Sequence, residues 1–263
     1  MLSHIQQHLA DHPWLERLHW FDEIGSTNDL ARQMAFDGCP SGTCILAGLQ
    51  TNGHGRMGRS FSSPAGKGVY LSCVLRPNCP PDRIMHLTCA AAVAAADAVK
   101  DAAGIDCGIK WTNDLVIGAK KLGGILTSLQ IEPNTGLASA AIIGIGINCL
   151  QKAEDFSPEI RHIATSLSMH TERCTPAALA AALISRLYQM DTQLQNKGQI
   201  MARYKDRCIT LGKEVSWMAG DLLHHGIALD LDEDGGLILQ LSDGTVKTAA
   251  FGEVSIRGMY GYL

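Results

Sequence analysis

The sequence predicts an α+β protein in which a mixed β-sheet packs with helices and a small β-barrel follows. Two observations support this fold class. Up to residue 208, helical patterns alternate with apolar strand-like runs, whereas from residue 209 onward only short β-like runs between turn residues remain. We therefore expect two units, residues 1–208 and residues 209–263, of which the second is a small barrel of about 50 residues.

The helices of the first unit are predicted from capping residues and from apolar residues at helical spacing. Ser26 or Thr27 caps one helix, which stops near Gly38. A proline pair opens a long alanine-rich helix that ends at Gly104, and a Thr-Pro pair opens a second long helix. Besides the helix capped at Ser26 or Thr27, the expected helices in chain order are His4 to Ala10, Pro80 to Ala103, Thr175 to Leu194 and Ile200 to Arg207.

Strand-like apolar runs alternate with these helices. In the first unit they cover Leu18 to Phe21, Cys44 to Leu49, Val69 to Leu75, Cys107 to Trp111, Lys121 to Ile131 and Leu137 to Ile147. Turn residues from Pro133 to Gly136 connect the last two runs as a hairpin. In the second unit the runs cover Glu214 to Trp217, Gly226 to Leu231, Leu237 to Leu241 and Thr245 to Ala250.

Composition excludes several classes of protein. The net charge of −4 argues against sequence-independent nucleic-acid binding, which requires a basic surface. The longest apolar segment is alanine-rich and interrupted by Asp97, so no membrane span is expected, and the N-terminus lacks the pattern of a secretory signal. The nine cysteines are scattered singly without a C-x-x-C pair. We expect free core thiols and a cytoplasmic location.

A glycine-rich loop from Gln50 to Arg59 is the most informative motif. It contains Gly53, Gly55, Arg56, Gly58 and Arg59. Glycine lets the backbone approach an anion closely, and arginine supplies permanent charge with several donors. The spacing also fits G-x-G-x-x-G, but that dinucleotide motif needs a helix at the glycines and an acidic residue about 20 positions later, and the sequence has neither. The loop therefore indicates a strand–loop–strand site for a phosphate or an acyl phosphate.

Four further clusters accompany this loop. They are Ser26-Thr27-Asn28, Lys110-Trp111-Thr112-Asn113-Asp114, Lys120-Lys121-Leu122-Gly123-Gly124 and Ile143-Gly144-Ile145-Gly146-Ile147-Asn148. Taken alone, the first is better explained as a helix cap, the second as a turn, and the third equally well as a hairpin rim. Glycine weakens a strand interior, so the fourth indicates either close approach of a ligand or tight packing against a helix.

In their common order, these five motifs resemble those of the biotin protein ligases. The resemblance covers residues 26–148, and the β-rich tail after Leu211 is similar to the SH3-like C-terminal domain of that family. It implies the catalytic fold that biotin ligases share with class II aminoacyl-tRNA synthetases. It also implies a monofunctional enzyme, because only 25 residues precede Ser26 and a DNA-binding winged helix needs more.

The resemblance implies acyl transfer in two steps. Biotin and ATP, with Mg²⁺, would form biotinyl-5′-AMP, and a lysine of a biotin carboxyl carrier protein, such as that of acetyl-CoA carboxylase, would then attack the mixed anhydride. The biotin carboxylate and the α-phosphate repel each other. Arg56, Arg59 and Lys121 are the expected catalytic residues because charge-assisted hydrogen bonds offset this repulsion.

The family pattern also implies binding roles for individual residues. Biotin would contact Ser26, Thr27, Asn28, Gln50, Gly53, His54, Gly55, Arg56, Lys121, Gly124, Gly144 and Gly146. ATP and the adenylate would contact Arg56, Arg59, Phe61, Asn113, Asp114, Lys121 and Asn148. Asp114 would ligate Mg²⁺, whose preferred ligands are oxygens.

Three positions depart from the family pattern, and two other functions remain open. His54 and Met57 stand where arginine is usual, and Thr112 replaces the proline of Lys-Trp-Pro-Asn-Asp. An imidazole is mostly uncharged at neutral pH, so we expect His54 to retain the adenylate less tightly than arginine would. The alternatives are a lipoate or octanoate ligase of the same superfamily and a non-catalytic biotin sensor. A homodimer through the catalytic sheet is common in the family.

Overall fold

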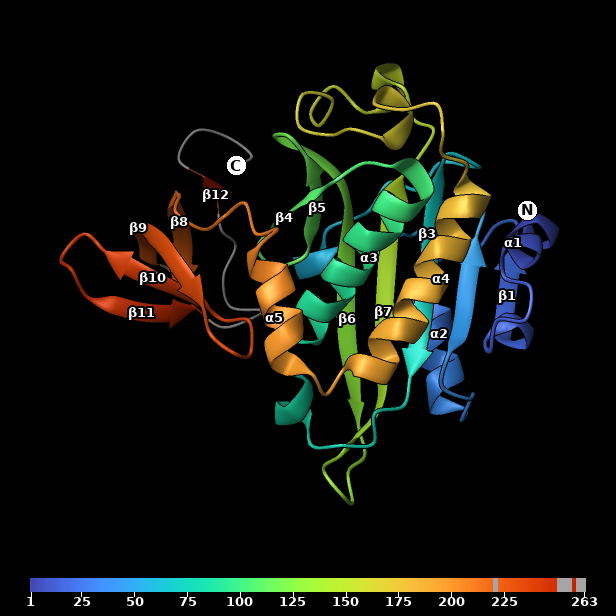
Figure 1. Ribbon diagram of the computed structural model, residues 1–263, viewed down its shortest axis with the longest axis horizontal. Helices are drawn as coiled ribbons and strands as arrows, with labels where there is room; N and C mark the ends of the chain where they lie inside the picture. Colours follow the sequence, from blue (N-terminus) through green and yellow to red (C-terminus); the bar gives the residue numbers. More distant parts are fainter. Residues whose placement is uncertain (220–221, 250–256, 259–263) are drawn as a thin grey trace.

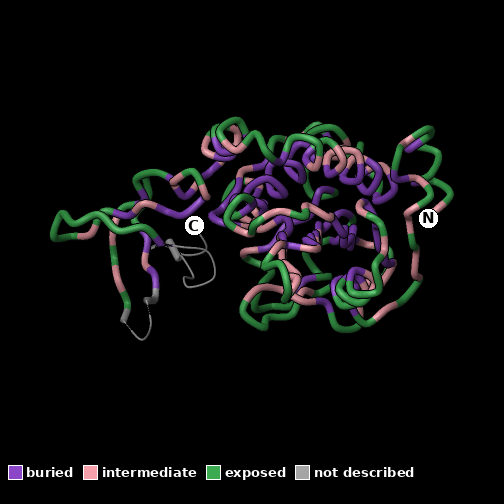
Figure 2. The backbone as a smooth tube through the Cα atoms, turned by 90° about the horizontal axis from the view of Figure 1, so that it is seen from below, coloured by how far each residue is buried: buried purple, intermediate pink, exposed green. Residues whose placement is uncertain are grey.

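A computed structural model describes residues 1–219, 222–249 and 257–258 of the chain. Two β-sheets organise these residues (Figure 1). The large sheet has the order β1-β2-β3-β7-β6-β5-β4, and the small sheet has the order β11-β10-β9-β8-β12. The buried backbone gathers between the helices and the large sheet, whereas the small sheet projects to one side (Figure 2).

The large sheet is mixed, as predicted. Its strands are β1 (Leu18–Phe21), β2 (Thr43–Ala47), β3 (Gly68–Leu75), β4 (Gly108–Lys110), β5 (Asp114–Ile117), β6 (Lys120–Ile131) and β7 (Ala138–Asn148). β1 pairs parallel with β2, and the other neighbours pair antiparallel. The small sheet is antiparallel and consists of β8 (Glu214–Ala219), β9 (Leu222–Leu231), β10 (Leu237–Leu241), β11 (Val246–Ala249) and β12 (Arg257–Gly258).

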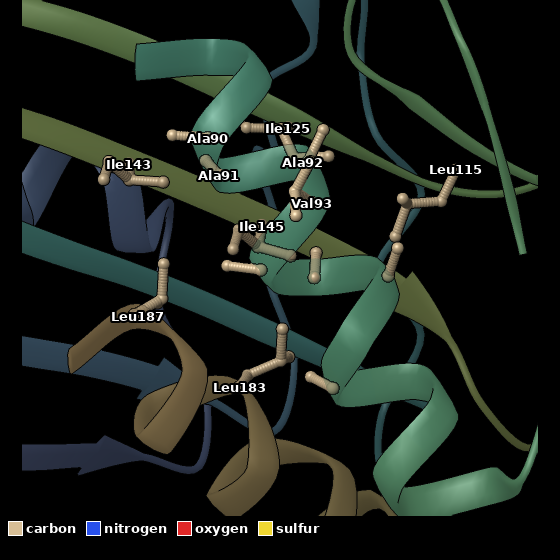
Figure 3. Packing of buried hydrophobic residues seen from close by; sticks show 14 of the residues in the cluster. Ala90, Ala91, Ala92, Val93, Leu115, Ile125, Ile143, Ile145, Leu183 and Leu187 are labelled. Carbon is tan, nitrogen blue, oxygen red and sulfur yellow. The ribbon is translucent and has the colours of Figure 1, made fainter. Parts of the chain in front are cut away.

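Helices cover both faces of the large sheet. They are α1 (Leu2–His8), α2 (Thr27–Phe36), α3 (Leu87–Ala103), α4 (Pro176–Gln193) and α5 (Lys197–Lys205). α3 and α4 lie side by side across one face (Figure 1). Successive strand residues point to opposite faces. Ile143 and Ile145 of β7 therefore pack with α3 and α4 (Figure 3), whereas Ile142 packs with α2 on the other face.

The alanine-rich sequence of α3 fits its central position. Alanine lets a helix lie close to its neighbours, and 13 of the 17 residues of α3 are buried. Figure 3 shows Ala90, Ala91 and Ala92 among larger side chains of the sheet and of α4. The helix ends at Gly104, whose φ of 71° is the left-handed cap that the sequence predicted.

Most predicted elements are confirmed, and two predictions were wrong. α3 starts at Leu87 and not at Pro80, because a separate 3₁₀ turn, Pro81–Ile84, is followed by the buried His86. Strand β5 was missed: the turn after Lys110 reverses the chain at once, so that Asp114 pairs with Lys110. Residues 250–256 and 259–263 of the predicted barrel lie outside the described residues.

The cysteines and the helices agree with the composition. All nine cysteines are free, and seven of them are buried, as the prediction of core thiols requires. Burial raises the pKa of the Cys107 thiol to about 12, so this thiol remains protonated and unreactive at neutral pH. Among the helices that the structure describes, none combines the length and the apolar character that crossing a membrane demands.

His86 is a buried histidine that makes folding depend on pH. It is 0% exposed, its Nε2–H donates to the Leu194 carbonyl at 2.8 Å, and its Nδ1 has no hydrogen-bond partner in the described part of the chain. Desolvation lowers the pKa of His86, and the Leu194 carbonyl opposes this effect. A folded pKa below the unfolded value means that the unfolded chain binds the proton first. With respect to His86, the free energy of unfolding is therefore highest above about pH 6.5, and it declines as the pH falls below that value.

We expect the free energy of unfolding to fall between pH 6.5 and pH 5 by up to about 1.4 kcal/mol per pH unit for each such histidine. His86→Gln keeps an N–H donor for Leu194 but cannot titrate, so its unfolding free energy should vary less over this interval. Denaturant unfolding at a series of pH values measures the difference. The matched control is His4→Gln in α1, where the histidine is exposed. Equal pH dependence in wild type and His86→Gln would contradict the assignment.

Candidate functional site

All five sequence motifs meet at one cavity of about 710 Å³. Most of the predicted site residues line it: Ser26, Thr27, Asn28, Gln50, His54, Gly55, Arg56, Arg59, Phe61, Asn113, Asp114, Lys121, Gly124, Gly144 and Gly146. These residues come from the start of α2, from the loop between β2 and β3, and from β5, β6 and β7. Sequence segments more than 100 residues apart therefore contribute to a single site.

One end of the cavity is built from neutral hydrogen-bonding groups. Ser26 caps α2 by accepting a hydrogen bond from Asp29 N at 3.4 Å, which confirms the capping interpretation for this residue. The next residue behaves differently. Thr27 donates from both its backbone N and its Oγ1 to Gln50 Oε1, each at 2.9 Å. Gln50 Nε2 in turn donates to Ser63 Oγ at 2.9 Å. The Gln50 amide is thus held in one orientation beside the cavity.

Asn28 is the clearest sign of a polar ligand at this end. Its side chain is buried, and neither Oδ1 nor Nδ2 has a hydrogen-bond partner among the described residues. An unpaired buried polar group costs about 1–3 kcal/mol. Such groups call for an explanation, and the amide lines the cavity. A ligand that offers both a donor and an acceptor would satisfy it.

The glycines of β7 make room for site residues. A Cβ atom at Gly144 would lie 2.6 Å from Asn28 Nδ2, and one at Gly146 would lie 2.5 Å from Phe61 Cε1. Of the two explanations that the sequence left open, packing against a helix therefore applies to Gly144, which faces α2. Gly146 is needed because the Phe61 ring lies against the strand. A Cβ atom at Gly124 would have Asp114 Oδ1 as its nearest neighbour, at 3.4 Å, which is an ordinary van der Waals distance.

The glycine-rich loop forms a compact turn between β2 and β3. Gly55 N donates to Arg59 O at 2.7 Å, and Phe61 N donates to Gly53 O at 2.8 Å. A short 3₁₀ turn, Arg56–Gly58, lies within the loop and no α-helix begins between Gln50 and Arg59, so the strand–loop–strand prediction is confirmed. His54 Nε2 lies 2.7 Å from Asp29 Oδ2, which ties the loop to the first turn of α2.

The other end of the cavity is cationic. Arg56 Nη1 donates to Thr112 Oγ1 at 2.8 Å and to Asn113 Oδ1 at 3.0 Å. Burial lowers the pKa of Arg56 and the Asp114 carboxylate opposes this, but a guanidinium stays charged in proteins. Lys121 Nζ donates to Asp114 Oδ1 at 2.6 Å. Arg59 lines the same space. Lys110 lines the cavity as well, and four cations with one carboxylate favour a polyanionic ligand.

Two predicted residues are not among those that line the cavity. Gly53 belongs to the glycine-rich loop, and a Cβ atom there would lie 2.5 Å from Phe61 O. Asn148 is buried and engaged elsewhere: its Nδ2 donates to Thr165 O, and its Oδ1 accepts from Gln151 Nε2, both at 3.0 Å. Their roles in ligand binding stay predictions.

Sequence reasoning missed several lining residues. Lys110 and Trp111 line the cavity and belong to a motif that the sequence had already singled out, so the signal was present. Ser72 lies inside β3, and its Oγ is 2.9 Å from Thr27 Oγ1. His162 and Ile163 come from the connection between β7 and α4, which carries no motif. Only tertiary structure brings these two residues to the site.

The site contains one carboxylate for a metal ion. Among residues 1–219, 222–249 and 257–258 there is no group of three or more His, Cys, Asp or Glu side chains that could hold a metal. Asp114 is the acidic residue among those lining the cavity. This arrangement fits Mg²⁺, which commonly binds one or two carboxylates while substrate phosphates and water complete its shell.

Comparisons with known proteins agree with this geometry. Residues 20–148 match the biotin/lipoate A/B protein ligase family, and residues 210–257 match the biotin protein ligase C-terminal domain. The chain is 34% identical over 235 residues to the bifunctional ligase/repressor BirA of Bacillus subtilis, covering 88% of this chain and 72% of that protein. It is 30% identical over 243 residues to the biotin--[acetyl-CoA-carboxylase] ligase of Mycobacterium tuberculosis, covering 89% of this chain and 87% of that protein.

A solved structure shows the same similarity to biotin protein ligases. The biotin protein ligase from Aquifex aeolicus in complex with biotin and ATP superposes with a TM-score of 0.77 at 26% identity. The superposition covers 92% of this chain and 98% of the Aquifex chain. The similarity therefore spans both sheets.

Proposed function

Because the chain belongs to the biotin protein ligase family, we infer that it activates biotin with ATP and transfers the biotinyl group to a biotin carboxyl carrier protein. The observation that carries this function is the division of this cavity into a neutral end and a cationic end. Its neutral end, at Thr27, Asn28 and Gln50, suits the uncharged ureido group of biotin, and its cationic end suits the triphosphate of ATP.

In the first step, a biotin carboxylate oxygen attacks the α-phosphorus, and the bond from that phosphorus to the leaving pyrophosphate breaks. Arg56, Arg59 and Lys121 offset the repulsion between the two anions, each charge-assisted hydrogen bond being worth about 1.5–3 kcal/mol. The protein supplies position and charge and no covalent intermediate. This agrees with the absence of a nucleophile–base pair in the proposed machinery.

In the second step, the Nζ of the carrier lysine attacks the acyl carbon of biotinyl-5′-AMP, and AMP leaves. The same cations stabilise the charge on the departing phosphate. Phe61 lies against Gly146 beside the loop, where it would cover the adenylate and exclude water. Asp114 is the side chain that would hold Mg²⁺ arriving with ATP, where the metal would neutralise phosphate charge.

Four further properties extend this proposal. We propose a division into units at residue 208, supported by the separate sheet of β8–β12. Free cysteines support a cytoplasmic location. A net charge of −4 supports a ligase without a nucleic-acid partner. A homodimer through the large sheet stays an expectation, which light scattering of the purified protein tests directly.

The function is tested by incubating the protein with biotin, labelled ATP and a carrier domain. We expect biotin-dependent pyrophosphate exchange, labelled biotinyl-AMP and a biotinylated carrier lysine. Replacing biotin by lipoate should abolish exchange, which separates biotin ligation from lipoate ligation. Biotin binding without ATP turnover would instead identify a sensor.

Lys121→Ala should slow both adenylate formation and transfer by about 10²–10³-fold, as does the loss of a donor that stabilises transition-state charge. Pyrophosphate exchange and carrier biotinylation measure the two steps. The adjacent Lys120 does not line the cavity, so Lys120→Ala is the matched control and should retain activity. Near-normal turnover in Lys121→Ala would remove this residue from the catalytic set.

His54→Arg should slow the release of biotinyl-AMP about two- to fivefold, the range expected for one partly exposed ion pair. A permanent charge replaces an imidazole on the loop that faces the adenylate. Rapid dilution of preformed complex gives the release rate. Met85→Arg adds the same charge at a residue that is 42% exposed and does not line the cavity, and it serves as the control. Equal release rates in wild type and His54→Arg would reject the role of this position.

A further inference from the structure

Thr112 occupies a special place beside the cationic end of the cavity. It stands where the family motif Lys-Trp-Pro-Asn-Asp has proline, so its hydroxyl is a group that the usual motif lacks. The residue is only 1% exposed, and its Oγ1 accepts a hydrogen bond from Arg56 Nη1 at 2.8 Å. This contact joins residues 56 positions apart, one on the glycine-rich loop and one on the turn between β4 and β5.

The contact fixes the orientation of a planar group. Arg56 Nη1 carries two hydrogens, and its partners are Thr112 Oγ1 and, at 3.0 Å, Asn113 Oδ1. Asn113 is itself held, because its Nδ2 donates to Ile125 O at 2.9 Å. With one nitrogen anchored twice, the plane of the guanidinium is set. Within the described part of the chain, its Nε–H and Nη2–H groups have no hydrogen-bond partner and are available to an anion.

The turn that carries Thr112 is well supported. Tyr204 of α5, which is fully buried, donates from its hydroxyl to Thr112 O at 2.9 Å. The preceding residue is held as well: Trp111 N donates to Thr210 Oγ1 at 2.9 Å. A β-branched side chain has few χ1 rotamers, so a fixed backbone also fixes the position of Oγ1. The acceptor is thus preorganised before any ligand binds.

We propose that Thr112 is a positioning residue, which holds Arg56 and the glycine-rich loop in the orientation that receives the α-phosphate. The proposal rests on the ligase function, because Arg56 acts on the reacting phosphate. Thr112 itself is not among the residues that line the cavity. Its contribution comes entirely from orienting the guanidinium, which is how a group remote from the reacting atoms changes a rate.

Two substitutions separate the hydroxyl from the shape of the side chain. Thr112→Val removes the acceptor at nearly constant volume, and we expect kcat for pyrophosphate exchange to fall about tenfold, equivalent to about 1.4 kcal/mol. KM for biotin should stay within about twofold, because the neutral end is unchanged. Thr112→Ser restores the hydroxyl and should recover most of the rate. Thr43→Val is the matched control, since it removes another buried threonine hydroxyl, which donates to Pro40 O far from Arg56.

A double-mutant cycle tests whether Thr112 acts through Arg56. In an Arg56→Ala background, Thr112→Val should cause no further loss. The same tenfold loss in that background, or a Thr112→Ser variant that folds normally but stays as slow as Thr112→Val, would overturn the proposal. An unchanged rate in Thr112→Val would overturn it too.

A measurement without turnover distinguishes failure of this proposal from failure of the ligase function. Trypsin cleaves after Arg56 and Arg59, so its cleavage rate reports release of the loop. We expect faster cleavage there in Thr112→Val than in wild type, Thr112→Ser or Thr43→Val. Inactivity of the wild-type protein toward biotin would reject the ligase function alone, whereas equal cleavage in all four proteins would reject the positioning role alone.

Discussion

Four cationic side chains, those of Arg56, Arg59, Lys110 and Lys121, line one cavity before any ligand arrives, and their mutual repulsion is the constraint on which the site depends. Like charges repel more strongly where solvent is partly excluded. The protein offsets this with one carboxylate and with neutral acceptors: Asp114 pairs with Lys121, while Thr112 and Asn113 accept hydrogen bonds from Arg56. Neutral acceptors hold a guanidinium without cancelling its charge, so the cavity keeps a net attraction for phosphate.

The neutral end of the cavity solves the opposite problem, because it has to bind an uncharged group tightly. Gln50 is fixed by Thr27 and Ser63, so its orientation does not have to be established when a ligand enters. The amide of Asn28 is the exception, since it stays unpaired in the described structure and Gly144 leaves it room. The two ends thus use different physical means, fixed hydrogen-bonding groups in one and concentrated charge in the other.

Local sequence patterns predicted what local interactions determine. The bounds of β1 and the cap of α2 follow from apolar runs and from Ser26, and the structure confirms both. The start of α3 was wrong because a tertiary contact decides it: His86 is buried against the end of α4. The engagement of Asn148 was hidden for the same reason, since its partner Thr165 lies in a connection without any motif. The site residues themselves were predicted because the five motifs follow one another in the same order as in the biotin protein ligases. No single motif would have identified them.

The turn from Lys110 to Asp114 connects the chemistry to the rest of the molecule. Trp111 Nε1 donates to Gly235 O at 2.8 Å, so the small sheet holds this turn from one side. Tyr204 of α5 holds it from another, and α5 is tied to the small sheet where Lys205 meets Asp230 at 2.7 Å. The acceptors of Arg56 therefore stand on a segment fixed by elements that are distant in sequence. In this arrangement the small sheet supports the orientation of the cations although the cavity lies in the large sheet, which gives a physical reason for the two sheets to occur in one chain.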